Sequence, residues 1–251
     1  MGTARKLAES YAQANRLVQH NWFKRLTSFL DISSGSKCLD IGCGTGINTA
    51  YLADKVGKDG FVTGIDPDEN RINIAKKEYQ RENVNYVVGK SIDLPPYNGG
   101  YDLVISNAVM HWVKYEEKVK TYQRVHGLLK KDGVLAICEG ASMIHNFAIF
   151  LHFLSPDQKA ALPFHFLTIA ENEKVFADIG FHAVRMEHFV SVDTCKSLDE
   201  FFNWSNATLN DRGIDFYKIY RENRDKIDIT VGSDGTVDVS ANLNFMILEK
   251  K

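Results

Sequence analysis

Residues 37–46 have the sequence Lys-Cys-Leu-Asp-Ile-Gly-Cys-Gly-Thr-Gly. The apolar start predicts a buried strand, and the alternating glycines predict a tight turn, since glycine adopts positive φ at little cost. Residues 47–56, which follow, have a helical pattern. A turn without side chains exposes backbone N–H groups and a helix N-terminus to a ligand. This stretch therefore predicts a strand–turn–helix unit that holds a ligand against its main chain.

The spacing of the glycines separates two classes of ligand. The dinucleotide fingerprint is Gly-x-Gly-x-x-Gly, and it places a pyrophosphate at the helix N-terminus. Here Gly42, Gly44 and Gly46 follow at every second position, and Asp40 precedes them. The carboxylate of Asp40 would repel a pyrophosphate and suits a cationic ligand. The pattern therefore disfavours a nicotinamide-dependent dehydrogenase, and the other interpretation is a turn with only a structural role.

A second strand is predicted over residues 61–66 and ends on Asp66, about twenty residues after the glycines. In doubly wound folds an acid at this place accepts hydrogen bonds from ribose hydroxyls. Pro67 cannot continue the strand, and Asp68 or Glu69 could cap the helix that follows. The alternative is that Asp66 itself only caps that helix.

Further periodic segments extend the same order of elements. Strands are predicted over 84–88, 103–105, 134–138, 184–192 and 237–248, and helices over 116–130 and 171–179. A helix end with a glycine turn is expected over 128–133. Strand–helix units repeated five times predict an α/β, doubly wound parallel sheet with helices on both faces.

Several ordered motifs resemble those of the class I S-adenosylmethionine-dependent methyltransferases. They are Asp-x-Gly-x-Gly-x-Gly at 40–46, the acid at 66, and Tyr-Asp-Leu-Val at 101–104. The resemblance covers residues 37–140. It implies S-adenosylmethionine as the cofactor and a Rossmann-like, mostly parallel, seven-stranded sheet with an antiparallel last strand and helical cap insertions.

The resemblance also implies which residues hold the cofactor. In the family the loop after the third strand often carries an acid that meets the adenine amino group, but here Lys90 takes its place. The adenine contact is therefore expected from the backbone near Ser91 and Ile92, or from Asp93. The complete expected set is Asp40, Gly42, Cys43, Gly44, Gly46, Asp66, Pro67, Ser91, Ile92 and Asn107.

Within the family the chain is similar to small-molecule methyltransferases related to the trans-aconitate and juvenile hormone acid enzymes. The similarity rests on the pair His111-Trp112 and on Tyr11, Asn15 and Gln19. By this resemblance Gln19 orients an acceptor carboxylate, and Trp112 walls the acceptor pocket or packs over the methyl group. His111 is the candidate general base for a hydroxyl or ammonium acceptor, because its ordinary pKa is near neutrality. Alternatively it hydrogen-bonds the cofactor loop or packs beside Trp112. A carboxylate acceptor needs no base.

The 251 residues, 44% of them hydrophobic, suffice for one large domain over 1–251. Its cofactor-binding core is predicted over 31–140. Segments 1–30, 141–170 and 197–222 are predicted to cover the acceptor site at the carboxyl ends of the strands. The last two are rich in aromatic residues, some of which should line the pocket while others only pack in the core.

The charge of the chain indicates which class of acceptor it binds. The net charge is −2, so no basic footprint predicts nucleic acid. Leu-Pro-Pro-Tyr at 94–97 superficially resembles a motif of nucleic-acid amino methylases, but that motif belongs after the fourth strand, where residues 106–109 are Ser-Asn-Ala-Val. A small-molecule acceptor is expected, and the alternatives are a nucleic-acid methyltransferase and a non-catalytic cofactor-binding protein. The oligomeric state is not predicted.

No apolar run is long enough to predict a membrane span or a secretory signal, so a cytoplasmic protein is expected. The four cysteines at 38, 43, 138 and 195 form no Cys-x-x-Cys pair. Free thiols and no metal site are therefore predicted.

Overall fold

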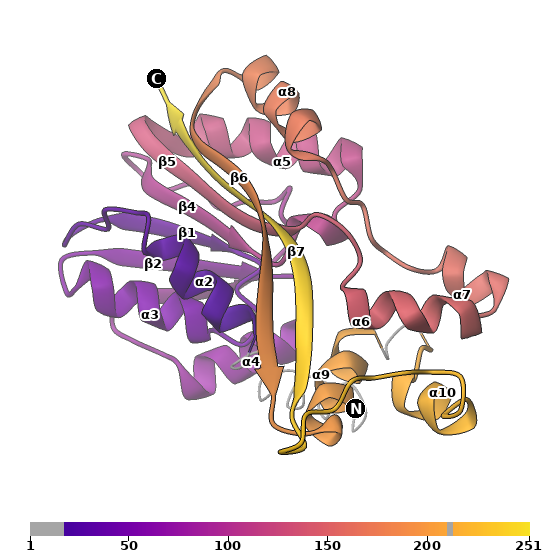
Figure 1. Ribbon diagram of the computed structural model, residues 1–251. Helices are drawn as coiled ribbons and strands as arrows, with labels where there is room; N and C mark the ends of the chain where they lie inside the picture. Colours follow the sequence, from indigo (N-terminus) through magenta and orange to yellow (C-terminus); the bar gives the residue numbers. More distant parts are fainter. Residues whose placement is uncertain (1–17, 210–212) are drawn as a thin grey trace.

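The computed structural model describes residues 18–209 and 213–251, so Tyr11 and Asn15 lie outside the described residues. The centre of the fold is a seven-stranded sheet with strand order β3-β2-β1-β4-β5-β7-β6 (Figure 1). Its strands are β1 Lys37–Ile41, β2 Phe61–Asp66, β3 Val84–Val88, β4 Tyr101–Asn107, β5 Leu129–Gly140, β6 Phe181–Cys195 and β7 Val237–Lys250.

The directions of the strands confirm the predicted Rossmann-like sheet. β1 pairs in parallel with β2 and β4, and the parallel pairing continues outward to β3 and β5. β7 runs antiparallel between β5 and β6. Ile41 lies beside Ile65 and Ser106, so β1, β2 and β4 end at one edge of the sheet. Ligands of open α/β sheets bind at this edge.

Helices cover both faces of the sheet, as predicted. The structure contains α2 Gln19–Thr27, α3 Ile47–Val56, α4 Glu69–Glu78, η1 Met110–Trp112, α5 Tyr115–Leu128, α6 His145–Ala148, η2 Ile149–Phe153, α7 Pro156–Ala160, α8 Ile169–Ile179, α9 Leu198–Leu209 and α10 Phe216–Glu222. α3 begins and ends at the residues that the sequence pattern predicts. The described helices α2, α3 and α4 pack on one face, and α5 and α8 pack on the other.

Two apolar cores follow from the alternation of side chains along the strands. Cys38 and Ile105 contribute to the core beneath α2, α3 and α4. Leu39 and Val104, their chain neighbours, contribute to the core beneath α5 and α8. Because both faces are covered, the central strands are buried almost throughout and largely apolar, which is why they could be located from the sequence. All four cysteines are buried free thiols.

A loop joins β3 to β4, as expected after the third strand, so the strand–helix order predicted to repeat five times is interrupted here. Pro95 and Pro96 remove backbone donors there and oppose helix formation. The side chain of Leu94 is fully buried in the core beneath α5 and α8, so the loop contributes to this core although it contains no helix. Arg124 of α5 fixes the loop by donating from Nη2 to the carbonyl oxygen of Leu94 at 2.6 Å.

The connection from α5 to β5 also differs from the prediction. α5 ends at Leu128, and β5 already begins at Leu129, where the sequence suggested a helix end and a glycine turn. The residue with positive φ is Asp132, at 60°, and not Gly133. Asp tolerates the left-handed region better than most residues, while Gly133 leaves room for the carbonyl oxygens of Lys130 and Tyr101, each 3.0 Å from where its Cβ would lie.

β6 and β7 extend beyond the other strands toward α9, and α6, α7, α9 and α10 gather beside them (Figure 1). These helices come from the two segments predicted as cap insertions, 141–170 and 197–222. Among the described residues no helix is both long and apolar enough to cross a bilayer.

Candidate active site

The turn after β1 requires its glycines. Gly42, Gly44 and Gly46 have φ of +71°, +55° and +92°. A Cβ atom on Gly42 would lie 2.2 Å from Cγ2 of Val109, far inside contact distance. The turn is therefore packed against the segment that follows β4, and substitution would displace one or the other.

Asp40 at the end of β1 is buried, and Oδ2 accepts a hydrogen bond from the hydroxyl of Thr49 at 2.6 Å. Burial raises the pKa of Asp40 to about 7, the bond from Thr49 opposes this shift, and the charge of Asp66 adds to it. A cation placed beside Asp40 would favour its ionised form.

Asp66 at the end of β2 lies at the same edge and points at the glycine turn. Its Oδ2 accepts from the backbone N–H of Gly44 at 3.0 Å, and its Oδ1 accepts from that of Asp68 at 2.9 Å. Burial raises its pKa. Asp68 is the N-cap of α4, with its side chain accepting from Asn70 and Arg71. The capping alternative therefore applies to Asp68 and leaves Asp66 for the turn.

The other residues expected at the cofactor lie along the same edge. Cys43 is buried in the turn, and Pro67 is exposed. Ser91 and Ile92 are half-buried in the β3–β4 loop, where the Ser91 hydroxyl accepts from Thr121 at 3.1 Å. Lys90 and Asp93 are exposed.

Asn107 joins this edge to the neighbouring pocket. Its Nδ2 donates to the carbonyl oxygen of Gln19 at 2.9 Å. Its Oδ1 is buried and has no hydrogen-bond partner among the described residues. A buried amide oxygen without a donor is uncommon in folded proteins and indicates a place for a ligand donor.

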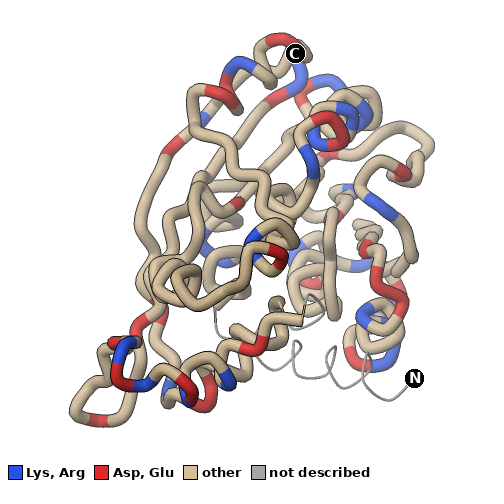
Figure 2. Tube along the Cα trace, turned by 90° about the vertical axis from the view of Figure 1, so that its right-hand side faces the viewer, with Lys and Arg blue, Asp and Glu red and all other residues tan. Residues whose placement is uncertain are grey.

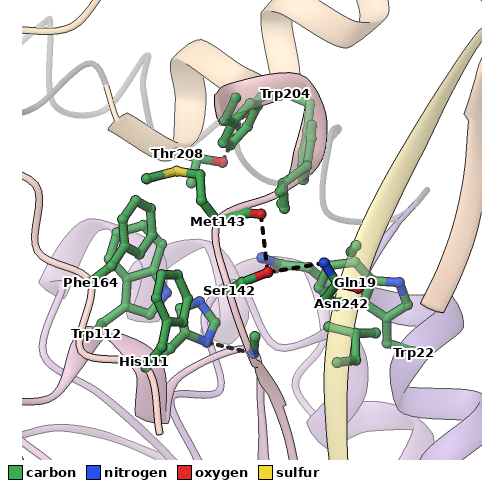
Figure 3. A pocket seen from close by; sticks show the side chains of 16 residues that line it. Gln19, Trp22, His111, Trp112, Ser142, Met143, Phe164, Trp204, Thr208 and Asn242 are labelled. Carbon is green, nitrogen blue, oxygen red and sulfur yellow. Dashed lines mark hydrogen bonds between the residues drawn. The ribbon is translucent and has the colours of Figure 1, made fainter. Parts of the chain in front are cut away.

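A pocket opens next to Gln19, whose carbonyl oxygen accepts from Asn107, and all three residues predicted for catalysis line it (Figure 3). Gln19 comes from α2, and His111 and Trp112 come from η1. Among the described residues the lining consists of Gln19, Trp22, His111, Trp112, Gly140, Ser142, Met143, Ile144, Phe147, Phe164, Phe166, Trp204, Thr208, Ala241, Asn242 and Leu243. The largely apolar and aromatic lining is typical of small-molecule sites.

His111 is held in one protonation state. The backbone N–H of Gly140 donates to its Nδ1 at 3.1 Å, so the neutral ring carries its proton on Nε2. Burial, followed by the charge of Lys118, lowers the pKa of His111 to about 3. No group among residues 18–209 and 213–251 accepts from Nε2. The ring therefore offers the pocket a hydrogen-bond donor and not a free lone pair.

Aromatic rings build the wall around His111. Phe164 and Phe166 stack on each other at a centroid distance of 5.3 Å, and their rings lie 6.2 and 6.1 Å from that of His111. Trp112 packs on Phe164 at 4.9 Å, while its Nε1 donates to the carbonyl oxygen of Ala108. As expected, some aromatic residues of these segments line the pocket and others only pack in the core. Phe164 and Phe166 line the pocket, whereas Phe150 and Phe202 are core residues that do not.

Part of this pocket was not predicted from the sequence. Asn242 and Leu243 lie on β7, which was interpreted only as the last strand. The buried ion pair of Lys118 and Glu139 near His111, with Nζ and Oε2 3.5 Å apart, was also not predicted. A signal for Lys118 exists, because it lies on the same helix face as the buried residues Thr121, Tyr122 and Val125.

Comparisons with known proteins agree with the fold and the motifs. Residues 38–133 match the family model described as a methyltransferase domain. A demethylmenaquinone methyltransferase of Staphylococcus aureus is 28% identical over 207 residues, which cover 73% of this chain and 85% of the relative.

Solved structures share the fold at low sequence identity. The YcgJ protein of Bacillus subtilis is 16% identical, with a TM-score of 0.63 over 92% of this chain and 99% of that one. A Haemonchus contortus phosphoethanolamine N-methyltransferase, solved with S-adenosylhomocysteine, is 18% identical, with a TM-score of 0.58 over 92% and 52% of the two chains. The ordered motifs, the matching domain and the curated relative together support S-adenosylmethionine-dependent methyltransferase activity for this chain.

Proposed function

We propose that this enzyme methylates the ionised carboxylate of an apolar small molecule that binds in the pocket beside His111. One observation supports this acceptor most strongly. Among the sixteen lining residues His111 is the only one with an ionisable acid or base group, and its pKa of about 3 and its occupied Nδ1 make it a poor base. A hydroxyl or ammonium acceptor must lose a proton, whereas a carboxylate is ionised at neutral pH.

The polar groups of the pocket suit an acceptor that carries oxygen atoms. Nε2–H of His111 is a donor, and the side-chain amide of Gln19 can donate as well. Trp204 also lines the pocket, and its buried Nε1 has no acceptor among the described residues. The rest of the lining is largely apolar and aromatic, which favours a hydrocarbon body on the ligand.

We propose that S-adenosylmethionine binds at the glycine turn, where buried polar groups are placed to contact it. Asp66 would accept from the ribose hydroxyls, the glycine turn would let the ligand approach the main chain, and Asn107 Oδ1 would accept from an ammonium group. The unpartnered Oδ1 of Asn107 and the buried acid Asp40 fit a cationic ligand. S-Adenosylmethionine supplies an activated methyl group on a sulfonium, so the protein needs only to align the acceptor and exclude water. Cys43, Pro67, Ser91 and Ile92 complete the proposed contacts.

We also propose that the enzyme is related to the trans-aconitate and juvenile hormone acid methyltransferases. In this proposal Gln19 and Trp112, which both line the pocket, orient the acceptor. A second candidate acceptor is an aromatic ring, suggested by the name of the Staphylococcus aureus relative. A nucleic-acid acceptor has less support. Acidic and basic residues are interspersed along the described chain in Figure 2, and the pocket is closed in by aromatic side chains.

The experiment is a survey of acceptors with methyl-labelled S-adenosylmethionine, read by mass spectrometry. The survey should include apolar carboxylic acids, alcohols, amines, a demethylated naphthoquinol and an oligonucleotide. We expect label in methyl esters of apolar acids. Binding of S-adenosylhomocysteine without transfer to any acceptor would instead support a non-catalytic protein.

A further inference from the structure

An ion pair lies buried near His111, and neither of its residues lines the pocket. Lys118 of α5 and Glu139 of β5 have side chains 1% and 0% exposed, and Nζ lies 3.5 Å from Oε2. Burial lowers the pKa of Lys118 and raises that of Glu139, while each charge opposes the shift of the other. Buried pairs are often no more stabilising than apolar side chains of similar volume. Stability alone is therefore a weak explanation for this pair.

The polar partners of the pair point to residues 164–168, here called the strap. Lys118 Nζ donates to the carbonyl oxygen of His165 at 2.9 Å. Asn172 Nδ2 donates both to Glu139 Oε1 at 2.9 Å and to the carbonyl oxygen of Thr168 at 3.2 Å. The strap has no regular secondary structure, so its peptide groups depend on such side chains.

The strap is also tied to the segment that carries His111. The backbone N–H of His165 donates to the carbonyl oxygen of His111 at 2.7 Å. The carbonyl oxygen of Leu167 accepts from Asn244 Nδ2 of β7 at 3.0 Å. Both peptide groups of His165 are thus bonded, one to η1 and one to Lys118.

The strap supplies the aromatic wall of the pocket. Phe164 and Phe166 both line it and flank His165 in sequence. Phe164 lies beside His111 and Trp112 in Figure 3. Since the fixed peptide groups of His165 lie between these two rings, the bond from Lys118 determines where the rings stand against His111.

We propose that Lys118 is a positioning residue, whose ammonium, oriented by Glu139, clamps the strap so that Phe164 and Phe166 form a fixed acceptor wall with His111. Lys118 does not line the pocket, so it acts on the acceptor through the strap. This inference rests on the proposed binding of the acceptor in the pocket.

The test compares three variants of the full chain. Lys118→Met removes the ammonium and keeps the length of the side chain. The double variant Lys118→Met/Glu139→Met replaces the pair by apolar groups and is expected to fold even if the single variant does not. Lys130→Met is the matched control, because it breaks the partly exposed pair of Lys130 and Asp102, 2.7 Å apart, away from the pocket.

The first readout does not depend on the acceptor. Hydrogen exchange of the strap amides, His165 above all, should be faster in the double variant than in the wild type and the control. Unchanged protection of these amides would overturn the proposal, whatever molecule the enzyme methylates.

The second readout measures binding of dodecanoic acid, an apolar carboxylic acid, to the complex with S-adenosylhomocysteine. We expect the dissociation constant and KM to rise about tenfold in the double variant, with the affinity for S-adenosylhomocysteine unchanged. A purely structural pair would lower the Tm and leave KM per folded enzyme unchanged, which would overturn the proposal. If the wild type neither binds nor methylates this acid, the carboxylate assignment fails, and KM is measured with the best acceptor of the survey.

Discussion

The backbone N–H of Gly140 donates to Nδ1 of His111 across 3.1 Å, and this bond decides what the ring can do. Gly140 is the last residue of β5, so the donor is part of the sheet and cannot turn away. With Nδ1 occupied, the neutral ring presents Nε2–H to the pocket. The general base suggested by the sequence therefore gives way, in our proposal, to a donor that binds an acceptor oxygen.

The first prediction concerns the pH dependence of catalysis. His111 has a pKa of about 3, below its ordinary value, so it stays neutral throughout the usual assay range. We expect kcat/KM for an apolar acid to show no inflection from His111 between pH 5.5 and 8. An acid limb near pH 6.5 that is present in the wild type and lost in His111→Gln would restore the base role.

The same pKa shift predicts a stability effect. The unfolded chain binds a proton at His111 near pH 6.5, whereas the folded chain resists it down to about pH 3. The free energy of unfolding should therefore fall as the pH drops below 6.5, by up to about 1.4 kcal/mol per pH unit. Urea unfolding of the wild type and of His111→Gln between pH 4.5 and 7 should show the smaller pH slope in the variant.

Asp40 gives a pH prediction for the cofactor. In the free protein its pKa is about 7, so at pH 6 most of the molecules carry the protonated carboxyl. A cationic ligand prefers the carboxylate, so the affinity for S-adenosylmethionine should rise about tenfold from pH 6 to pH 8. Calorimetry on Asp40→Asn should show a flat profile over the same range. If the affinity changes equally with pH in the wild type and in Asp40→Asn, the charge of Asp40 does not contribute to cofactor binding.

Asp66→Ala tests the ribose contact. Loss of a charge-assisted bond should weaken binding of S-adenosylhomocysteine by about 1–3 kcal/mol. The side chain also holds the N–H of Gly44, so part of this loss comes from a looser turn. Asp59→Asn, an exposed acid in the loop before β2, serves as the control and should bind as the wild type does. Unchanged calorimetric affinity in Asp66→Ala would remove Asp66 from the site.

Two glycines with positive φ allow the effect of backbone strain to be separated from the effect of a steric clash with a neighbouring residue. Gly42 and Gly35 have φ of +71° and +85°, but only a Cβ on Gly42 meets another residue, Val109. Gly35→Ala should cost about 1–2 kcal/mol of stability, from the left-handed backbone alone, with unchanged binding of S-adenosylhomocysteine. Gly42→Ala should also weaken that binding, and Val109→Ala should restore part of it. If Gly35→Ala and Gly42→Ala bind S-adenosylhomocysteine equally well, the turn does not contribute to cofactor binding.

The sequence predicts the sheet well because its central strands and turns are specified locally. The apolar runs of β1, β2 and β4 and the glycines at 42–46 predict strands and a turn from their own residue types, without reference to distant segments. The loop before β4 was expected, but the burial of Leu94 in it was not, because that burial is a tertiary contact that no periodicity records.

The acceptor pocket is less predictable, since it is assembled from distant segments. Gln19, His111 and Trp112 were singled out as candidates, but their meeting with Trp204 and Asn242 depends on how the cap helices and β7 pack. The protonation state of His111 depends on the N–H of a residue 29 positions away and on a lysine from α5. Such contacts are properties of the fold and not of any one segment.

The most direct measurement compares three acceptors with one carbon skeleton: dodecanoic acid, dodecanol and dodecylamine, each incubated with methyl-labelled S-adenosylmethionine. We predict that the acid alone gives a labelled product, the methyl ester, because the described residues that line the pocket supply donors and no effective base. Equal or faster labelling of the alcohol or the amine would contradict it.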